Sequence, residues 1–485
     1  LIDDGKINYN DNLGKFFPPL EGTLLEKITI SQLLSHTSGL PLSLVTDAAY
    51  MTKWTSLEEM VLSIRESDII LPPGYRFWYS DAGADFLGAV VEKVTGEPLQ
   101  DYIGRKVLNP LGMTQTRVIT SGKKYDGDVV SLYLKYGGRW VKGWSQAGNP
   151  LYPFAWGSQS YYGTPSDYSR LLMMIMNRGE KDNVRVLSRR LADRMLSPLN
   201  PMNQLGNDLP VSTGFPGYSV KYGQMMIVYE PGLKDKGHPL IFGHSGSDGT
   251  MSYAIPDLGL TVLLFTQSRN NPVRIGFEKT IFKSLFGSAE SNMEPKSSES
   301  EHAGRYINRA DGSWWEIHYE GGFRVLSDSY GNHYQLNDPD DQQIASISGS
   351  NNLKVQYVNA SDGTPEGIRI YRTYEWFRDL TANPDEYNEY DADSLIKRQF
   401  AGRYRNPVGG GSIEAGYKSD LFLKLRDGSV IDLLPSGKTL DYVERDSPAN
   451  YVSFDYSSKA GYIMRTTETI FCASDTAAAS GRIRE

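Results

Sequence analysis

Apolar residues recur at helical spacing in several stretches of the N-terminal part of the chain. The clearest run follows a break at Pro72-Pro73-Gly74 and ends at Gly96, with apolar side chains at Leu87, Val90, Val91 and Val94. The same reasoning predicts helices over about 55–65, 168–176, 188–195 and 273–286, and a short helix from Ser31 to a turn at 37–39. Leu1–Gly5 has the pattern of a last helical turn with Gly5 as its C-cap.

Alternating apolar and polar residues predict strands in two other regions. One region, 219–267, gives strands at 224–229, 240–246, 252–256 and 260–266, and a separate hairpin is expected at 128–145 around Gly137-Gly138. After a polar, apolar-poor linker at 288–301, Ala303-Gly304-Arg305-Tyr306 recurs as Ala401-Gly402-Arg403-Tyr404. Each copy precedes aromatic-rich alternating strands. The chain is therefore predicted to be α+β, with a mixed domain over 1–287 and two all-β, barrel-like modules over 302–395 and 396–485.

Composition narrows the possible functions. The net charge of −8 without a basic patch argues against nucleic-acid binding. One cysteine, Cys472, permits neither an internal disulfide nor a cysteine-based metal cluster, and the six histidines have no metal-ligand spacing. No stretch has the length and apolarity of a membrane span. We therefore expect no metal, no cofactor, no nucleic-acid partner and no transmembrane segment in this chain.

Tyr79 stands at the start of the clearest helix, in Phe77-Trp78-Tyr79-Ser80-Asp81. A phenol held on such a turn can serve as a base or proton relay. The alternative is an ordinary N-cap by Ser80 or Asp81, and this turn taken alone favours the cap. His36 stands beside hydroxyl residues, and a hydrogen bond to a turn is the favoured interpretation because no nucleophile elbow or acid partner is near it in sequence. His318 and His333 are interpreted as strand residues.

A second polar motif changes the interpretation of Tyr79. His244-Ser245-Gly246 ends a predicted strand and precedes Ser247. Together with Tyr79-Ser80-Asp81, it resembles the second and third motifs of the penicillin-recognising serine hydrolases, which include class C β-lactamases, D,D-peptidases, esterases and D-aminopeptidases. Further landmarks in the same order are Leu33–Leu40, Pro73-Gly74, Leu87-Gly88, Pro110–Met113 and Thr164–Tyr168. The resemblance covers about residues 1–286 and implies a β-lactamase/transpeptidase-like domain, an antiparallel sheet flanked by helices with a helical subdomain. The two β modules add a resemblance to D-aminopeptidase.

The resemblance implies acyl transfer through a serine ester. Tyr79 would be the base or relay, tuned by nearby cationic charge, and Asp81 would take the position usually held by Asn. His244 would replace the third-motif Lys, with Ser245 and Gly246 beside it, and help to bind a carboxylate or the leaving group in a pH-dependent way. The backbone N–H of Ser247 would be an oxyanion donor. The remaining candidates, which either wall the pocket or simply pack, are Trp156, Tyr161 and Tyr162.

The nucleophile motif Ser-x-x-Lys is expected upstream of Leu1, on the helix that ends at Gly5. Two internal matches, Ser121–Lys124 and Ser394–Lys397, are interpreted as chance. The chain as written is therefore expected to be inactive alone. The favoured function is hydrolysis of amides or esters, D-amino-acid peptides above all. A carboxylesterase or β-lactamase of the same fold and a non-catalytic binding or scaffold protein remain alternatives. The family further implies an extracytoplasmic location, and a homo-oligomer is possible.

Overall fold

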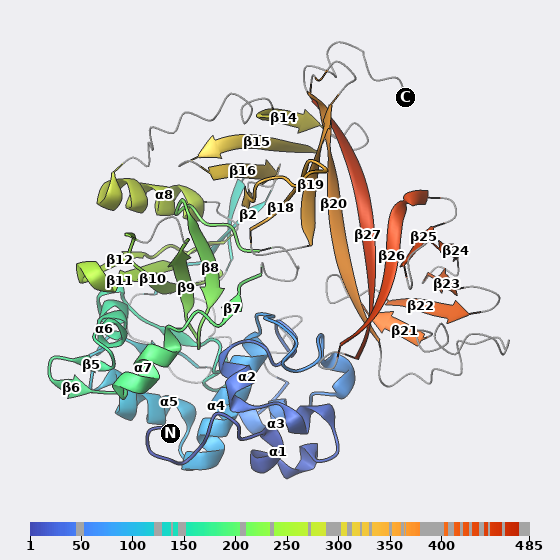
Figure 1. Cartoon of the computed structure of the whole chain (residues 1–485). Coiled ribbons are helices and arrows are strands. Elements are labelled where there is room, and N and C mark those ends of the chain that lie inside the picture. The colour runs from blue at the N-terminus through green and yellow to red at the C-terminus, as the bar shows by residue number, and fades with distance from the viewer. Residues whose placement is uncertain are drawn as a thin grey trace. The chain divides into compact units, whose positions relative to one another are not determined.

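The structure is a computed structural model of the chain (Figure 1). It has two compact units, Leu1–Leu205 with Tyr218–Glu278, and Gly206–Gly217 with Lys279–Glu485. The residues that it describes are 1–44, 53–120, 129–136, 139–143, 152–203, 210–232, 237–269, 273–287, 302–307, 313–320, 323–328, 332–348, 352–359, 363, 365–378, 402–405, 412–417, 421–425, 429–435, 441–444, 447–457 and 461–474. The predicted linker at 288–301 and both internal Ser-x-x-Lys matches lie wholly or partly outside these residues.

The sheet of the first unit is antiparallel. Within the described residues it has six strands in the order β12-β11-β10-β9-β8-β7. Their bounds are Asn200–Pro201 (β7), Tyr218–Tyr222 (β8), Ile227–Pro231 (β9), Ile241–Ser245 (β10), Met251–Ile255 (β11) and Leu260–Leu264 (β12). The predicted strands at 240–246, 252–256 and 260–266 are confirmed. The strand predicted to begin at Gln224 begins instead at Ile227, because Gly223–Met226 is a tight turn with Met225 at φ +55°.

A helical layer precedes this sheet in the chain and centres on α4, Asp81–Thr95. The Ser80 hydroxyl accepts the Gly83 N–H at 2.9 Å, and Gly96 closes the helix at φ +69°, so both predicted ends are confirmed. α4 contacts α1, α2, α3 and α5. The other helices of the unit are α1 (Leu13–Phe16), η1 (Pro18–Leu20), η2 (Leu24–Lys27), α2 (Ile30–Leu34), α3 (Leu57–Leu62), η4 (Glu66–Asp68), α5 (Leu99–Ile103), η5 (Gly104–Leu108), α6 (Pro165–Met176) and α7 (Arg189–Met195).

Two apolar clusters hold the first unit together. One joins the helical layer and includes Leu33, Leu57, Phe86 and Trp156. The other packs α6 on the sheet, where Leu172 and Ile175 share a cluster with Phe242 and Ala254. The minor strands are β1 (Arg117–Val118), β2 (Tyr133–Tyr136), β3 (Arg139–Lys142), β4 (Tyr161–Tyr162), β5 (Glu180–Lys181), β6 (Val184–Arg185) and β13 (Ser268–Arg269), and β2 with β3 confirms the predicted hairpin, whose two central glycines lie outside the described residues.

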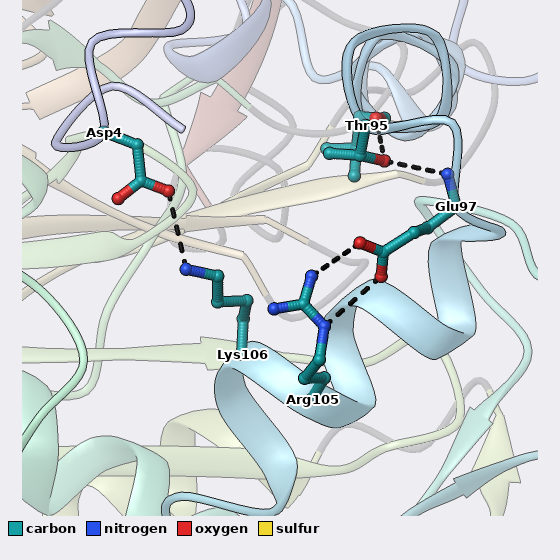
Figure 2. Close-up of polar contacts among 6 residues, drawn as sticks. Asp4, Thr95, Glu97, Arg105 and Lys106 are labelled. Atoms are coloured by element: carbon teal, nitrogen blue, oxygen red, sulfur yellow. Dashed lines mark hydrogen bonds and ion pairs between the residues drawn. The ribbon is translucent and has the colours of Figure 1, made fainter.

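The first residues form a helix-closing turn. Lys6 N–H donates to the Leu1 carbonyl at 3.0 Å, Gly5 N–H donates to the Ile2 carbonyl at 3.0 Å, and Gly5 has φ +66°. These paired bonds are the Schellman pattern that ends many α-helices, so the predicted C-cap at Gly5 is confirmed. Figure 2 shows the Asp4 carboxylate and the Lys106 ammonium of η5 pointing toward each other, 3.5 Å apart. In the same view Arg105 pairs with Glu97 at 2.7 Å, in the connection between α4 and α5.

The second unit is dominated by strands. Among the described residues, fourteen strands join in one sheet, and the long β20 and β27 pair with each other as well as with their neighbours. The bounds are Gly304–Ile307 (β14), Trp314–Glu320 (β15), Phe323–Asp328 (β16), His333–Leu336 (β17), Ile344–Ser346 (β18), Leu353–Asn359 (β19), Pro365–Arg378 (β20), Gly402–Arg405 (β21), Ser412–Tyr417 (β22), Leu421–Lys424 (β23), Val430–Pro435 (β24), Asp441–Glu444 (β25), Ser447–Ser457 (β26) and Gly461–Ser474 (β27). Helix α8, Val273–Phe286, matches its predicted bounds and spans the boundary between the two units.

The internal repeat corresponds to β14 and β21, which begin at equivalent glycines, Gly304 and Gly402. Strand β27, from the second predicted module, also pairs with β14 and β20 from the first. The two predicted modules therefore share strand pairings. Their boundary at 395 lies outside the described residues, and their barrel-like form stays a prediction.

Candidate active site

The turn before α4 holds Tyr79 through backbone bonds on both sides. Trp78 N–H donates to the His36 carbonyl at 2.7 Å, and Asp81 N–H donates to the Leu42 carbonyl at 2.8 Å. The Ser80 hydroxyl caps the helix and donates to the Pro41 carbonyl at 2.7 Å. Ser80 thus caps the helix, and the half-buried Tyr79 phenol is not needed as a cap.

His36 packs against the Tyr79 ring. Its own backbone is left-handed, at φ +51°, and its side chain is 2% exposed. The His36 Nδ1 accepts the Ser80 N–H at 3.3 Å, which confirms the predicted hydrogen bond to a turn. The His36 ring centroid lies 4.4 Å from that of Tyr79 and 4.8 Å from that of Tyr222. Burial and the nearby His244 lower the pKa of His36 to about 3, so it is neutral at neutral pH and packs as a ring.

His244 lies at the end of β10 and faces the same place. Its backbone pairs with that of Ser252 on β11, and the Ser252 hydroxyl bonds both the His244 N–H at 3.1 Å and its carbonyl at 2.9 Å. The His244 ring centroid is 6.1 Å from that of Tyr79. The two motifs that suggested the site, far apart in sequence, are therefore brought together.

Tyr222, on β8, completes this cluster and was missed by the sequence reasoning. It is fully buried, and its hydroxyl lies 3.1 Å from the His244 Nε2. The Tyr222 ring lies 6.3 Å from Tyr79 and 5.1 Å from Phe77. The available signal was the alternation of Tyr218, Val220 and Tyr222 on one strand face, which indicates only core packing.

The titratable groups that act on Tyr79 are acids. Burial raises the pKa of Tyr79 well above its ordinary range, and Asp81, Tyr168 and Asp85 raise it further. Burial also raises the pKa of Asp81 to about 6. Within the described part of the chain, the groups that shift the pKa of Tyr79 are thus carboxylates and a phenol. The cationic charge that we expected to tune this tyrosine does not come from those residues.

Asp85 connects α4 to a neighbouring loop. Its buried carboxylate accepts the Ser158 N–H at 2.9 Å, and burial raises the pKa of Asp85 to about 7. Trp156, in the same loop, is 1% exposed and packs against Phe154, with ring centroids 5.8 Å apart. Trp156 was expected either to wall the pocket or to pack in the core, and in the structure it packs in the core.

Tyr161 and Tyr162 form β4, which pairs with β1. Burial raises the pKa of Tyr162, and the charge of Asp248 raises it further, which indicates that this phenol lies near the turn after β10. Burial also raises the pKa of Tyr161 well above its ordinary range. Tyr162 is thus the one of the pair with an electrostatic connection to the third-motif turn.

The turn after β10 contains the other predicted residues. Gly246 N–H donates to the Thr250 carbonyl at 2.8 Å, and Gly249 N–H donates back to the Gly246 carbonyl at 3.1 Å. Ser245 and Ser247 are exposed, and the Ser247 hydroxyl donates to the Asp248 carboxylate at 3.4 Å. The oxyanion role of the Ser247 N–H stays a prediction.

No helix among the described residues has both the length and the apolar character needed to cross a bilayer.

Comparisons with known proteins identify similar chains. "Protein flp" of Staphylococcus aureus (strain N315) is 31% identical over 138 residues, which are 28% of this chain and 28% of that protein, so the match spans under a third of that relative. "Putative D-alanyl-D-alanine carboxypeptidase" of Escherichia coli (strain K12) is 22% identical over 300 residues, 56% of this chain and 66% of that protein.

Among solved structures, the "octameric penicillin-binding protein homologue from Pyrococcus abyssi" is 20% identical, with a TM-score of 0.47 over 89% of this chain and 84% of that one. The family model described as Beta-lactamase matches residues 1–279, which is more than half of the chain. The chain therefore belongs to the Beta-lactamase family, whose members are serine hydrolases, and its first unit has the β-lactamase/transpeptidase-like fold.

Proposed function

We propose that this protein hydrolyses amides or esters through a serine acyl-enzyme, with D-amino-acid peptides favoured. The observation that carries the proposal is the convergence of Tyr79 and His244, whose rings lie 6.1 Å apart although their motifs are far apart in the chain. A phenol held on a fixed turn beside a polar strand end can serve proton transfer during acyl transfer.

The reaction needs a nucleophile and a cation. The serine oxygen attacks the substrate carbonyl carbon while its proton passes to the Tyr79–lysine pair. The C–N or C–O bond then breaks as the leaving group takes that proton, and water hydrolyses the resulting ester. Tyr79 is half-buried, and nearby acids raise its pKa, so it becomes a base only when a cation lies against it. Both groups would come from a Ser-x-x-Lys motif, which the family resemblance implies.

Asp81 supports this assignment. Its half-buried carboxylate lies close enough to Tyr79 to raise the pKa of that phenol, and burial raises the pKa of Asp81 itself. A lysine ammonium between Asp81 and Tyr79 would favour the charged form of both groups. The backbone N–H of Ser247 and that of the nucleophile would receive the oxyanion.

The second unit and the location of the protein complete the proposal. Neighbouring strands run in order from β27 through β26 to β21 and then β20, and β20 also pairs directly with β27. We infer two barrel-like modules that are built around this shared β20–β27 pair. We also place the protein outside the cytoplasm, and we assign it a small peptide, amide or ester as its partner. A homo-oligomer is compatible with these assignments, and light scattering tests it.

A substrate panel tests the function. The protein as its gene encodes it is incubated with D-alanyl p-nitroanilide, the L-isomer, a short-chain p-nitrophenyl ester and nitrocefin. We expect turnover of the D-anilide in preference to the L-isomer. Turnover of the ester alone indicates a carboxylesterase, and turnover of nitrocefin alone indicates a β-lactamase. If the protein turns over none of them and takes no label from a fluorophosphonate, it is a binding or scaffold protein and the proposal is wrong. The chain of Leu1–Glu485 alone is expected to take no label.

A further inference from the structure

Both ring nitrogens of His244 are engaged inside the protein. The Nδ1 lies 2.8 Å from the Ser245 carbonyl oxygen, and the Nε2 lies 3.1 Å from the Tyr222 hydroxyl. Strand β9 separates β8 from β10, and its pairing reaches only to Ile227, which is opposite both Tyr222 and Gly243. The Tyr222 side chain therefore reaches His244 just beyond the start of β9.

These contacts fix one tautomer of the imidazole. A carbonyl oxygen has no proton to give, so the Nδ1 of His244 carries the proton and donates it to Ser245. The Nε2 is then an acceptor, and the Tyr222 hydroxyl donates to it. Because Tyr222 is fully buried, its hydroxyl would have to find another acceptor inside the protein if the Nε2 became protonated.

The surroundings also disfavour an imidazolium. The titratable groups around the pair are Tyr79 and Asp81 at the start of α4, His36 after α2 and Tyr168 on α6. The Asp81 carboxylate would favour a cation, whereas burial disfavours it. Burial has the larger effect, and it lowers the pKa of His244 although the bond to Ser245 opposes the shift. The lowered pKa of His244 favours the neutral ring.

We propose that Tyr222 is a positioning residue that holds His244 as a neutral imidazole, and that the site consequently prefers leaving groups without a free carboxylate. This inference rests on the proposed function and names its substrate class: carboxamides, anilides and neutral esters. A carboxylate placed against this position would meet an imidazole whose proton is already donated to Ser245 and whose lone pair faces Tyr222. It would lose its hydration without gaining a cation.

A matched pair of substrates tests the preference. D-alanyl-glycine amide and D-alanyl-glycine differ only in the charge of the terminal group, and both are supplied to the protein as its gene encodes it. We expect kcat/KM for the amide to exceed that for the acid by about tenfold or more at neutral pH, the factor that one charge-assisted hydrogen bond commonly contributes. Y222F removes the hydroxyl and keeps the ring against His36 and Phe77. In Y222F the ratio should fall, and it should fall further as the pH is lowered, because an imidazole whose Nε2 has lost its donor can take up a proton there.

A second readout does not depend on catalysis. In the unchanged protein the ¹⁵N shifts of His244 should report one neutral tautomer, protonated on Nδ1, and in Y222F the Nε2 shift should move because that nitrogen loses its hydrogen-bond donor. Y253F is the matched control, because it also removes one buried hydroxyl, bonded at 2.8 Å to Glu278, and it should leave both readouts unchanged. A preference for the acid, or identical His244 shifts with and without the Tyr222 hydroxyl, overturns the inference. If neither dipeptide nor any ester is turned over, the proposed function is wrong, and the ¹⁵N shifts alone decide whether Tyr222 positions His244.

Discussion

Replacing Gly157 with alanine tests how tightly the loop beside the site is fastened to α4. A Cβ at this position would lie 2.0 Å from the Ala84 carbonyl oxygen and 3.1 Å from the Asp85 Cα. Backbone atoms of a helix cannot move aside cheaply, so the loop has to move by about 1 Å to restore ordinary contact. That movement stretches the 2.9 Å bond between the Ser158 N–H and the Asp85 carboxylate.

The size of the effect follows from these two contacts. Overpacking in a core costs about 1–3 kcal/mol, and leaving a buried hydrogen-bonding group without its partner costs a further 1–3 kcal/mol or so. The reduced freedom of the unfolded chain returns about 0.4–1 kcal/mol. We expect G157A to lower the free energy of unfolding of the first unit by about 3 kcal/mol, which corresponds to about 6–12 °C in Tm for a domain of this size class.

The assay is urea unfolding followed by tryptophan fluorescence, with Trp156 in the affected cluster. G104A is the matched control, because a Cβ at Gly104 meets no atom within 4 Å and the backbone there is helical. The control should be unchanged or more stable by about 0.5–1 kcal/mol. Equal midpoints for G157A and G104A would refute the close approach of the loop to α4.

Two further predictions concern buried titratable groups. Asp85 has its pKa raised by burial to about 7, so the folded protein keeps a proton that the unfolded chain releases near pH 4; stability should therefore fall by up to about 4 kcal/mol as the pH rises from 4 to 7 or so. D85N should lose this slope in urea titrations at several pH values, and parallel curves for the two proteins would count against the assignment. His36 has its pKa lowered by burial to about 3, so the unfolded chain takes up a proton that the folded protein refuses, and stability should fall as the pH drops from about 6.5 toward 3. H36N, which tolerates the left-handed backbone, should remove that acid slope and cost about 2–3 kcal/mol through the lost ring contacts, measured against the unchanged protein at neutral pH.

The sequence predicted the parts of the fold that depend on local pattern. The helix after Tyr79, the C-cap at Gly5 and the strand that contains His244 follow from spacing, caps and glycines, and the structure confirms them. The strand start at Gln224 was predicted wrongly, because neighbouring apolar residues hid a turn that is fixed by the Leu34 and Met195 carbonyls. A distant contact of that kind leaves no periodic signal.

The sequence predicted which motifs form the site, but not the hydrogen bonds and ring contacts that connect them. Tyr79 and His244 were found through their resemblance to a family, whereas Tyr222 looked like any core tyrosine because nothing in sequence announces a partner on another strand. The pH-dependent binding role expected of His244 was inferred from its residue type and from the family resemblance. Its protonation depends on burial and on two hydrogen bonds, which only the three-dimensional arrangement supplies.

The central claim is that Tyr79 lies in an acyl-transfer site, and intact-mass measurement of the acylated protein tests it most directly. The protein as its gene encodes it, and its Y79F variant, are mixed with a fluorophosphonate and sampled over time. We predict one adduct per chain, carried by a serine of a Ser-x-x-Lys motif, and a rate of formation at least about a hundredfold lower in Y79F, the contribution expected of a positioned proton-transfer group. Absence of any adduct, or equal rates in the two proteins, would contradict the account.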